Sequence, residues 1–392
     1  MPSDHVPSEA SGPPLGHGRS RLPLGLFGML ALIAGVESYV MRHDYDLTTL
    51  IASNWEIEGR APARYAADSK VLCFGDSMVK FGIQPRVLGA SLGKPTYNFA
   101  LYCGSPQASY YMMRRALDAG SRPEAIVVDF QPEFLMGDSM KLLSRAFPEL
   151  LSVPEAADLC WQARDPGRFA EFLVAMALPS ARKRYEIRAN VAANIKGQDG
   201  SIRENLLARK RNWRVNRGAE ALPKNPHYQG DVPEFGGYPA MFWTPWKAHP
   251  LNVEYLERFL ELAESRQVPV FWVLQPNAAA VDERRGKVGY NAQYDAFVQG
   301  YLERFANLVA IDGRHVNYPH QVFTDPVHLD RDGATAYSLG VAEVIRDRLK
   351  GSGGGARFVA LPDKRERARE VALEDFNQSG EALKAEAAKL VR

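Results

Sequence analysis

The chain has 392 residues, which is enough for one large domain with additions or for two ordinary domains. Hydrophobic residues make up 46% and charged residues 24%, which excludes a wholly disordered, collagen-like or multi-spanning membrane protein. Since 48 Lys and Arg face 46 Asp and Glu, the net charge of +2 gives no general surface for nucleic acid, and we expect no nucleic-acid partner.

The first expected feature is an N-terminal membrane segment over residues 22–41. Residues 1–21 are rich in Pro, Ser, Gly and His, and we expect them to be disordered. The apolar run that follows Arg21 is interrupted only by Glu37, and its length suits a spanning helix of about 20 residues. The arginines before it predict a cytoplasmic N-terminus and an extracytoplasmic body. A cleaved signal peptide and a buried helix are the alternative interpretations.

From about residue 70 to residue 350, short β-branched or aromatic runs alternate with helical periodicity. The expected strands are 71–74, 97–100, 125–130, 268–274 and 308–311. The expected helices are 106–120, 253–267, 293–306 and 333–349. This alternation is typical of a parallel sheet covered by helices, so the predicted fold class is α/β with a central parallel sheet.

The regular alternation stops between about residues 137 and 250, where we expect an inserted lid or subdomain. Its middle, from Arg182 to Arg217, carries more basic than acidic residues. This excess indicates a solvated helical face or, as the alternative, a surface for an anionic polymer or lipid headgroups. Aromatic residues follow in a Gly- and Pro-containing region, where they either pack the insert onto the sheet or stack on a sugar or acyl chain: Phe235, Tyr238, Phe242, Trp243 and Trp246.

The folded domain is expected to end near residue 350. Residues 351–355 read GSGGG, the composition of a flexible linker. The tail over residues 362–392 is dense in Lys, Arg, Glu and Ala, which predicts a charged, solvated helix or a partly disordered extension.

Two short motifs carry the chemistry. The first strand runs directly into Gly75-Asp76-Ser77, which places a serine hydroxyl at the carboxyl end of a parallel strand, where open α/β sheets build their sites. A serine needs a base within hydrogen-bonding reach, and that base needs a carboxylate to orient it. Asp325 and His328 lie three residues apart, so the carboxylate can hold one ring nitrogen while the other faces Ser77.

Together, the GDS motif after the first strand and the D-x-x-H motif before the last helix resemble the SGNH (GDSL-type) hydrolase superfamily over residues 71–350. The resemblance implies a flavodoxin-like α/β/α sandwich and a triad of Ser77 as nucleophile, His328 as base and Asp325 as acid. It also implies that the backbone N–H groups of Ser77 and Gly104 bind the oxyanion. In the third block Gln131 stands where the family has asparagine, so its longer amide is the expected third donor.

The resemblance implies a membrane-anchored serine esterase that acts through an acyl-enzyme. Its expected substrates are O-acyl esters, chiefly acetyl esters, of an envelope glycan or a lipid-like ester. Two alternatives stay open: a polysaccharide O-acyltransferase that uses the same triad, and a catalytically silent glycan-binding protein.

The sequence gives no sign of a metal or cofactor site. No residues have the spacing of metal ligands. The chain has three cysteines, Cys73, Cys103 and Cys160, and no two of them form a Cys-x-x-Cys pair. Three cysteines are too few for a small protein held together by disulfides. We therefore expect no metal and no cofactor. Cys103 stands beside Gly104, where it either lines the pocket or is a small buried hydrophobic residue.

Overall fold

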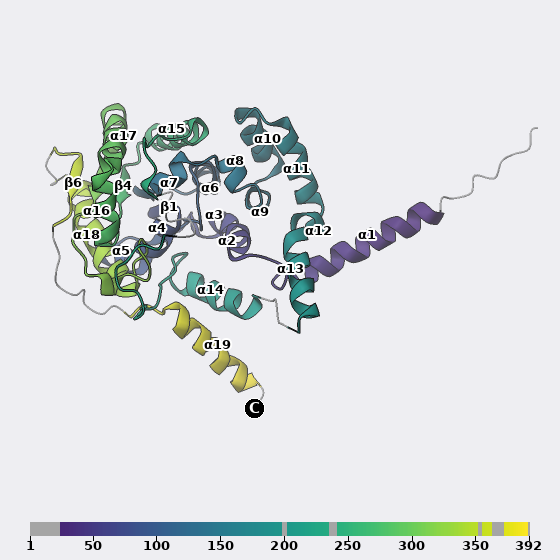
Figure 1. Cartoon of the computed structure of the whole chain (residues 1–392). Coiled ribbons are helices and arrows are strands. Elements are labelled where there is room, and N and C mark those ends of the chain that lie inside the picture. Colours follow the sequence, from purple (N-terminus) through teal and green to yellow (C-terminus); the bar gives the residue numbers. More distant parts are fainter. Residues whose placement is uncertain (1–23, 198–201, 235–240, 352–354, 363–371, 391–392) are drawn as a thin grey trace, which may run out of the picture.

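Parallel strands form the centre of the computed structural model, which describes residues 24–197, 202–234, 241–351, 355–362 and 372–390 (Figure 1). The segment predicted to be disordered, residues 1–21, lies outside these ranges. So do most of the GSGGG linker, at 352–354, and two residues of the aromatic region, Phe235 and Tyr238.

The described strands form one parallel sheet in the order β2-β1-β3-β4-β5-β6. Their bounds are β1 Val71–Gly75, β2 Thr96–Asn98, β3 Ala125–Asp129, β4 Val270–Leu274, β5 Leu308–Asp312 and β6 Phe358–Ala360. The first five overlap the expected strands, and their order is that of flavodoxin-like sheets. The predicted α/β sandwich with a central parallel sheet is confirmed.

Helices cover both faces of this sheet and extend beyond it. Those outside the predicted insertion are α1 Leu24–Arg42, α2 Leu50–Gly59, α3 Ala61–Tyr65, α4 Ser77–Gly82, α5 Pro85–Leu92, α6 Pro106–Asp118, α7 Pro132–Met136, α15 Pro250–Ser265, α16 Ala279–Lys287, α17 Tyr290–Arg304, α18 Arg331–Leu349 and α19 Phe376–Leu390. Those inside it are α8 Ser139–Leu142, α9 Phe147–Leu150, α10 Val153–Gln162, α11 Pro166–Ala177, α12 Pro179–Arg182, α13 Arg184–Ile195 and α14 Arg203–Val215. A short 3-10 helix spans His320–Val322.

Alternate side chains of each strand enter the two layers of the core, as the two-residue period of a strand requires. Leu72 and Phe74 of β1 belong to the cluster that includes buried residues of α6, α15 and α17. Val71 and Cys73 belong to the opposite cluster, with residues of α4, α5 and α18. The two faces are thus closed by different helices, and the carboxyl ends of the strands stay available for a site.

Local capping explains where two of the predicted helices begin. The Ser105 side chain accepts a hydrogen bond from Ala108 N, and Pro106 occupies the first helical position of α6. Asp330 accepts hydrogen bonds from the N–H groups of Asp332 and Gly333 at the start of α18. These caps fix the start of α6, which lies between the two chemical motifs in the sequence, and the start of α18, which follows the second motif.

The folded unit extends beyond the boundary predicted near residue 350. Strand β6 pairs in parallel with β5, with Ala310 opposite Phe358, and adds a sixth strand to the sheet edge. Helix α19 packs against α14, and Arg211 forms ion pairs with Glu374 and Glu386. The sheet thus continues past the boundary predicted near residue 350, and the charged tail contains the helix α19.

Seven helices occupy the described part of the predicted insertion, and several of its basic side chains pair with carboxylates. Arg209 pairs with Glu220, and Arg203 pairs with Asp46. In the aromatic region after α14, Trp246 packs edge-on against Tyr294 and Phe297. Trp246 therefore packs against the core, which agrees with the first of the two interpretations of this aromatic region. Trp243, in contrast, is 64% exposed.

The apolar helix α1 projects away from the body of the molecule (Figure 1). A window from Gly25 to Arg42 has a mean hydropathy of 1.3 and is 6% buried, so α1 is long and apolar enough to cross a membrane. It contacts the body through α12, where the Ser180 N–H and hydroxyl both donate to the Glu37 carboxylate. A single apolar N-terminal helix is compatible with a single-pass anchor.

Candidate active site

The turn after β1 presents the predicted nucleophile. The backbone angle φ of Gly75 is +135°, a conformation that side chains rarely allow. A Cβ at this residue would also lie 2.1 Å from the carbonyl oxygen of Asp129, so the turn admits only glycine. Asp76 then caps α4, since one of its carboxylate oxygens accepts from Met78 N at 2.8 Å. Ser77 is the first residue of α4 and is 9% exposed. The local geometry therefore sets the serine at the carboxyl edge of the sheet.

A tight hairpin carries the acid and the base. Phe323 and Leu329 form an antiparallel bridge, and Thr324 N donates to the carbonyl of His328 at 2.8 Å. Within the hairpin, Asp325 Oδ1 accepts from the N–H groups of Val327 and His328, both at 2.9 Å. These backbone contacts fix the position of the carboxylate beside the imidazole ring.

The structure brings the three predicted triad residues together. His328 Nδ1 lies 2.7 Å from Asp325 Oδ2, and His328 Nε2 lies 2.9 Å from Ser77 Oγ. The edge-to-face contact of the Phe81 ring, 4.9 Å between centroids, holds the imidazole in this orientation. Both distances lie within the hydrogen-bonding range that a nucleophile, base and orienting carboxylate require.

The electrostatics of the pair favour a charged histidine. Burial alone would lower the pKa of His328, but the charge and hydrogen bond of Asp325, with Asp76 and Glu133, outweigh burial and raise it. Burial would raise the pKa of Asp325, but His328 and two backbone N–H groups lower it below the ordinary range. Asp325 therefore favours its ionised form and stabilises the protonated form of the His328 ring.

Asp76 links the nucleophile turn to the turn after β3. Its second oxygen accepts from Gln131 N at 2.6 Å, so one carboxylate joins residues that follow two neighbouring strands. Burial raises the pKa of Asp76 to about 7, although the N–H groups of Gln131 and Met78 act in the opposite direction. A carboxyl group close to its titration point at neutral pH thus lies beside Ser77.

The three predicted oxyanion donors differ in their hydrogen bonding within the protein. The Ser77 N–H, at the first position of α4, has no acceptor in the described part of the chain. Gly104 lies against the nucleophile turn, where a Cβ would be 2.1 Å from Gly75 O, but its N–H donates to Leu101 O at 3.1 Å. Gln131 is 8% exposed, and its backbone N–H is taken up by Asp76. Their roles as donors stay predictions.

Helix α2 supports the site, which the sequence did not indicate. Asn54 accepts from Tyr102 N at 2.9 Å, and Trp55 Nε1 donates to Tyr102 O at 2.7 Å. Glu58, on the same helix, forms a fully buried ion pair with Lys80 of the nucleophile helix α4 at 2.9 Å. No short-range pattern could reveal these contacts, because Glu58 and Lys80 are 22 positions apart and each resembles an ordinary surface residue in the sequence.

A second buried polar group joins the insertion to the same region. Glu220 accepts hydrogen bonds from Tyr102 Oη, from Trp213 Nε1 and from Arg209, and its backbone N–H donates to Lys80 O. The turn that precedes Gly104 and the helix that carries Ser77 are therefore held by one network of charged and aromatic groups.

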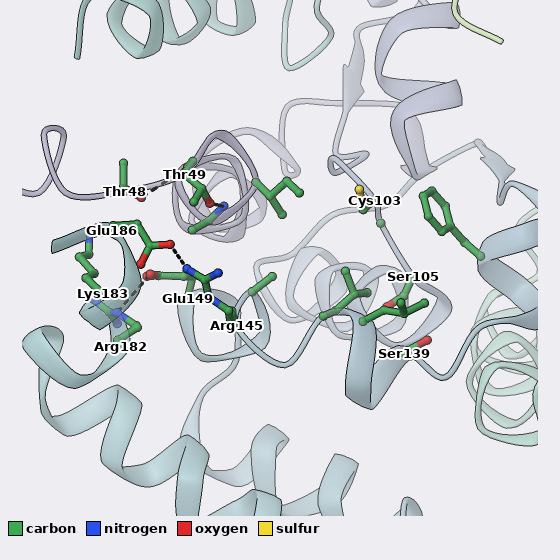
Figure 2. Close-up of a pocket in the computed structure, with 17 residues that line it drawn as sticks. Thr48, Thr49, Cys103, Ser105, Ser139, Arg145, Glu149, Arg182, Lys183 and Glu186 are labelled. Atoms are coloured by element: carbon green, nitrogen blue, oxygen red, sulfur yellow. Dashed lines mark hydrogen bonds and ion pairs between the residues drawn. The ribbon is translucent and has the colours of Figure 1, made fainter. Parts of the chain in front are cut away.

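A cavity of about 320 Å³ begins at Gly104 and extends between α2, α8 and α9 toward α12 and α13 (Figure 2). Cys103, Gly104 and Ser105 line one end, so the prediction that Cys103 lines a pocket agrees with the structure. Among the described residues there is no group of three or more side chains suited to hold a metal ion.

Comparison with models of known protein families and with curated proteins finds no match to this chain.

Proposed function

We propose that the chain is a membrane-anchored serine ester hydrolase of the SGNH type. The observation that supports this most directly is the continuous hydrogen-bonded series from Asp325 through His328 to Ser77, with distances of 2.7 and 2.9 Å. The position of the serine at the carboxyl edge of a parallel sheet supports the same interpretation. A protein that only bound glycans would have no need for a carboxylate, a histidine and a serine hydrogen-bonded in this order.

In the proposed reaction Ser77 Oγ attacks the ester carbonyl carbon, and its proton passes to His328 Nε2. The carbonyl oxygen gains negative charge, which the Ser77 N–H would stabilise, with Gly104 and Gln131 as the further donors we expect. Collapse of the tetrahedral intermediate breaks the bond to the leaving alcohol, which takes the proton from His328. Water then repeats the sequence on the acyl-enzyme, releases the carboxylic acid and restores the Ser77 hydroxyl.

Labelling with a serine-directed fluorophosphonate tests the first step. The full-length native protein is compared with Ser77→Ala and His328→Ala, and we expect labelling of the native protein only, because Ser77 Oγ must displace fluoride with His328 as base. The control is Ser109→Ala, which removes a buried hydroxyl on α6 and should leave labelling unchanged. Absence of labelling in folded native protein would contradict an activated serine.

Release of product distinguishes hydrolysis from transfer. An O-acetylated glycan added to the native protein should yield free acetate, and Ser77→Ala should yield none. Appearance of the acyl group on an added acceptor glycan, without free acid, would contradict hydrolysis and identify the chain as an acyltransferase.

We propose further that the folded body lies outside the cytoplasm. The supporting observations are the apolar helix α1 and the arginines that precede it in the sequence. Alkaline phosphatase fused after residue 392 of the full-length chain should be active in intact bacterial cells, and a fluorescent protein that folds only in the cytoplasm should stay dark at the same position. The reverse pattern would overturn this topology.

A further inference from the structure

The cavity that begins at Gly104 adjoins the residues of the proposed reaction. A Cβ on Gly104 would lie 2.1 Å from Gly75 O and 3.1 Å from the Cα of Asp76, so Gly104, which lines this end of the cavity, packs directly against the nucleophile turn. Phe134 lines the same end and belongs to α7, whose N-terminal residue follows Gln131. Gly104 therefore lies between the nucleophile turn and this end of the cavity, and neither Ser77 nor His328 is among the lining residues.

The middle of the cavity is apolar. Most of the other lining side chains are aliphatic and come from α2, α8 and the segment between α8 and α9, with Thr48, Thr49 and Ser139 as the polar exceptions: Ile51, Ala52, Leu142, Leu143 and Ala146. Figure 2 shows Cys103 and Ser105 toward one end of the cavity and the charged residues Arg145, Glu149 and Arg182 toward the other. An alkyl chain that enters this space gains free energy for each methylene it removes from water.

The far end of the cavity is polar and limits its length. Arg145 pairs with Glu186, and Arg182 Nε lies 3.1 Å from Glu149 Oε1. Glu149 Oε2 is buried without a hydrogen-bond partner among the described residues, and Arg182 Nε faces the other Glu149 oxygen. An alkyl chain that reaches this ion pair meets polar atoms in place of an apolar wall, so it gains nothing by further extension.

We propose that this cavity binds the acyl chain of the substrate, so that the protein prefers esters of medium-length acyl groups to acetyl esters. The inference rests on the proposed function and changes its expected substrate: the chain that suits the cavity extends from the carbonyl carbon at Gly104 along Leu143 and Ala146 and ends before Glu149 and Arg182.

Labelling rates with ethyl, octyl and hexadecyl fluorophosphonates measure this preference. In each reaction Ser77 Oγ forms a bond to phosphorus, fluoride leaves and His328 takes the proton, so only the alkyl group differs. In full-length protein we expect the octyl probe to react at least about tenfold faster than the ethyl probe, because it buries several methylenes, and faster than the hexadecyl probe. Equal ethyl and octyl rates would overturn the proposal.

Two variants separate the cavity from the triad. Ala52→Trp fills the middle of the cavity from the partly exposed first turn of α2, and Leu142→Trp does so from a side chain that is 63% exposed. Both should lower the octyl rate about tenfold and change the ethyl rate less than about twofold. Val288→Trp places the same bulk on an exposed residue after α16, and it should leave the ratio of rates unchanged. An equal loss with both probes would contradict acyl binding in the cavity.

Hydrogen exchange keeps the inference testable if Ser77 proves unreactive. Octanoate added to Ser77→Ala should slow amide exchange over residues 48–52 and 142–149, while acetate should not. If no probe labels the native protein but octanoate gives this protection, the proposed hydrolysis fails and the acyl-binding cavity stands. If octanoate leaves exchange in both segments unchanged, the acyl-binding cavity is overturned.

Discussion

Asp325 acts on both the backbone and the side chain of His328. Its Oδ1 accepts two backbone N–H groups of the hairpin and its Oδ2 meets His328 Nδ1, so the carboxylate fixes the ring's position and its charge together. This part of the site was predictable from the sequence, because a D-x-x-H spacing lets one tight turn form all three contacts. The pairing with Ser77 was a weaker expectation, since it joins residues 251 positions apart.

The raised pKa of His328 predicts the pH dependence of hydrolysis. The ring must be neutral to accept the Ser77 proton, so activity should rise with pH, with a midpoint above the ordinary histidine pKa. Asp325→Asn removes the charge that opposes deprotonation, so the midpoint of kcat/KM should move to lower pH while the rate falls by about 10³ to 10⁴. The measurement is kcat/KM for a nitrophenyl ester across pH 5 to 9, a range centred on neutral pH. A midpoint that moved upward in Asp325→Asn would contradict this account.

Gln131 carries the main departure from the family pattern. The backbone N–H of Gln131 donates to the Asp76 carboxylate and does not depend on the side chain, so Gln131→Ala removes only the side-chain amide. If that amide stabilises the oxyanion, as we expect, kcat should fall about 10²-fold with little change in KM. The melting temperature is the control, because Gln131→Ala keeps the backbone hydrogen bond to Asp76 and should leave the fold intact. An unchanged kcat would assign the oxyanion to backbone donors alone.

At the scale of elements, the strands that the sequence revealed are those with continuous apolar runs. Val270–Leu274 and Ala125–Asp129 are buried along their whole length, and such runs are recognisable without knowledge of the fold. Strand β6 was missed because Phe358–Ala360 is only three residues long, is partly exposed and follows a run of glycines. Its place in the sheet depends on pairing with β5, which no local pattern encodes.

The buried pair of Glu58 and Lys80 couples α2 to the nucleophile helix, and its loss should destabilise the protein. Both side chains are almost fully inaccessible, so Glu58→Gln leaves the Lys80 charge without its partner. We expect a loss of about 4 kcal/mol in the free energy of unfolding, measured by urea denaturation of the full-length protein. The double variant Glu58→Leu, Lys80→Met removes both charges and should recover most of this loss.

An exposed pair gives the matched control. Glu283 and Lys287 form an ion pair on α16 with both side chains largely exposed, and Glu283→Gln should leave the unfolding midpoint unchanged. A Glu58→Gln variant as stable as this control would show that Lys80 loses its charge or reaches water, and that the pair does not hold α4.

At the scale of the whole molecule, both ends of the described chain are tied to the predicted insertion. Helix α1 meets α12 through Glu37 and Ser180, and α19 packs along α14. These contacts join segments more than a hundred positions apart, so composition could indicate only that the ends were apolar or charged. The insertion is therefore better described as the element that connects both termini to the sheet than as a separate lid.

Asn212 is the residue on which the contact between α14 and α19 depends most. Its side chain is fully buried, donates to Glu374 O and Ser379 Oγ, and accepts from Ala221 N. Asn212→Ala would leave the Glu374 carbonyl without this donor and the Ala221 N–H without this acceptor inside the protein. We expect a loss of about 3 kcal/mol in unfolding free energy.

The loosening caused by Asn212→Ala should also be local at first. Amide exchange should accelerate in α19 and in residues 212–221 before the sheet is affected. The reason is that the lost hydrogen bonds join Asn212 to Glu374 and Ala221, whereas β1 and β3 are held by pairing with each other. Glu386→Gln removes the ion pair between Glu386 of α19, which is 58% exposed, and Arg211 of α14; it is the matched control and should leave exchange unchanged.

Through Arg209 and Glu220, α14 also reaches Tyr102, so Asn212→Ala should slow fluorophosphonate labelling of Ser77 as well. Unchanged labelling with accelerated exchange would show that the tail stabilises α14 without supporting the site.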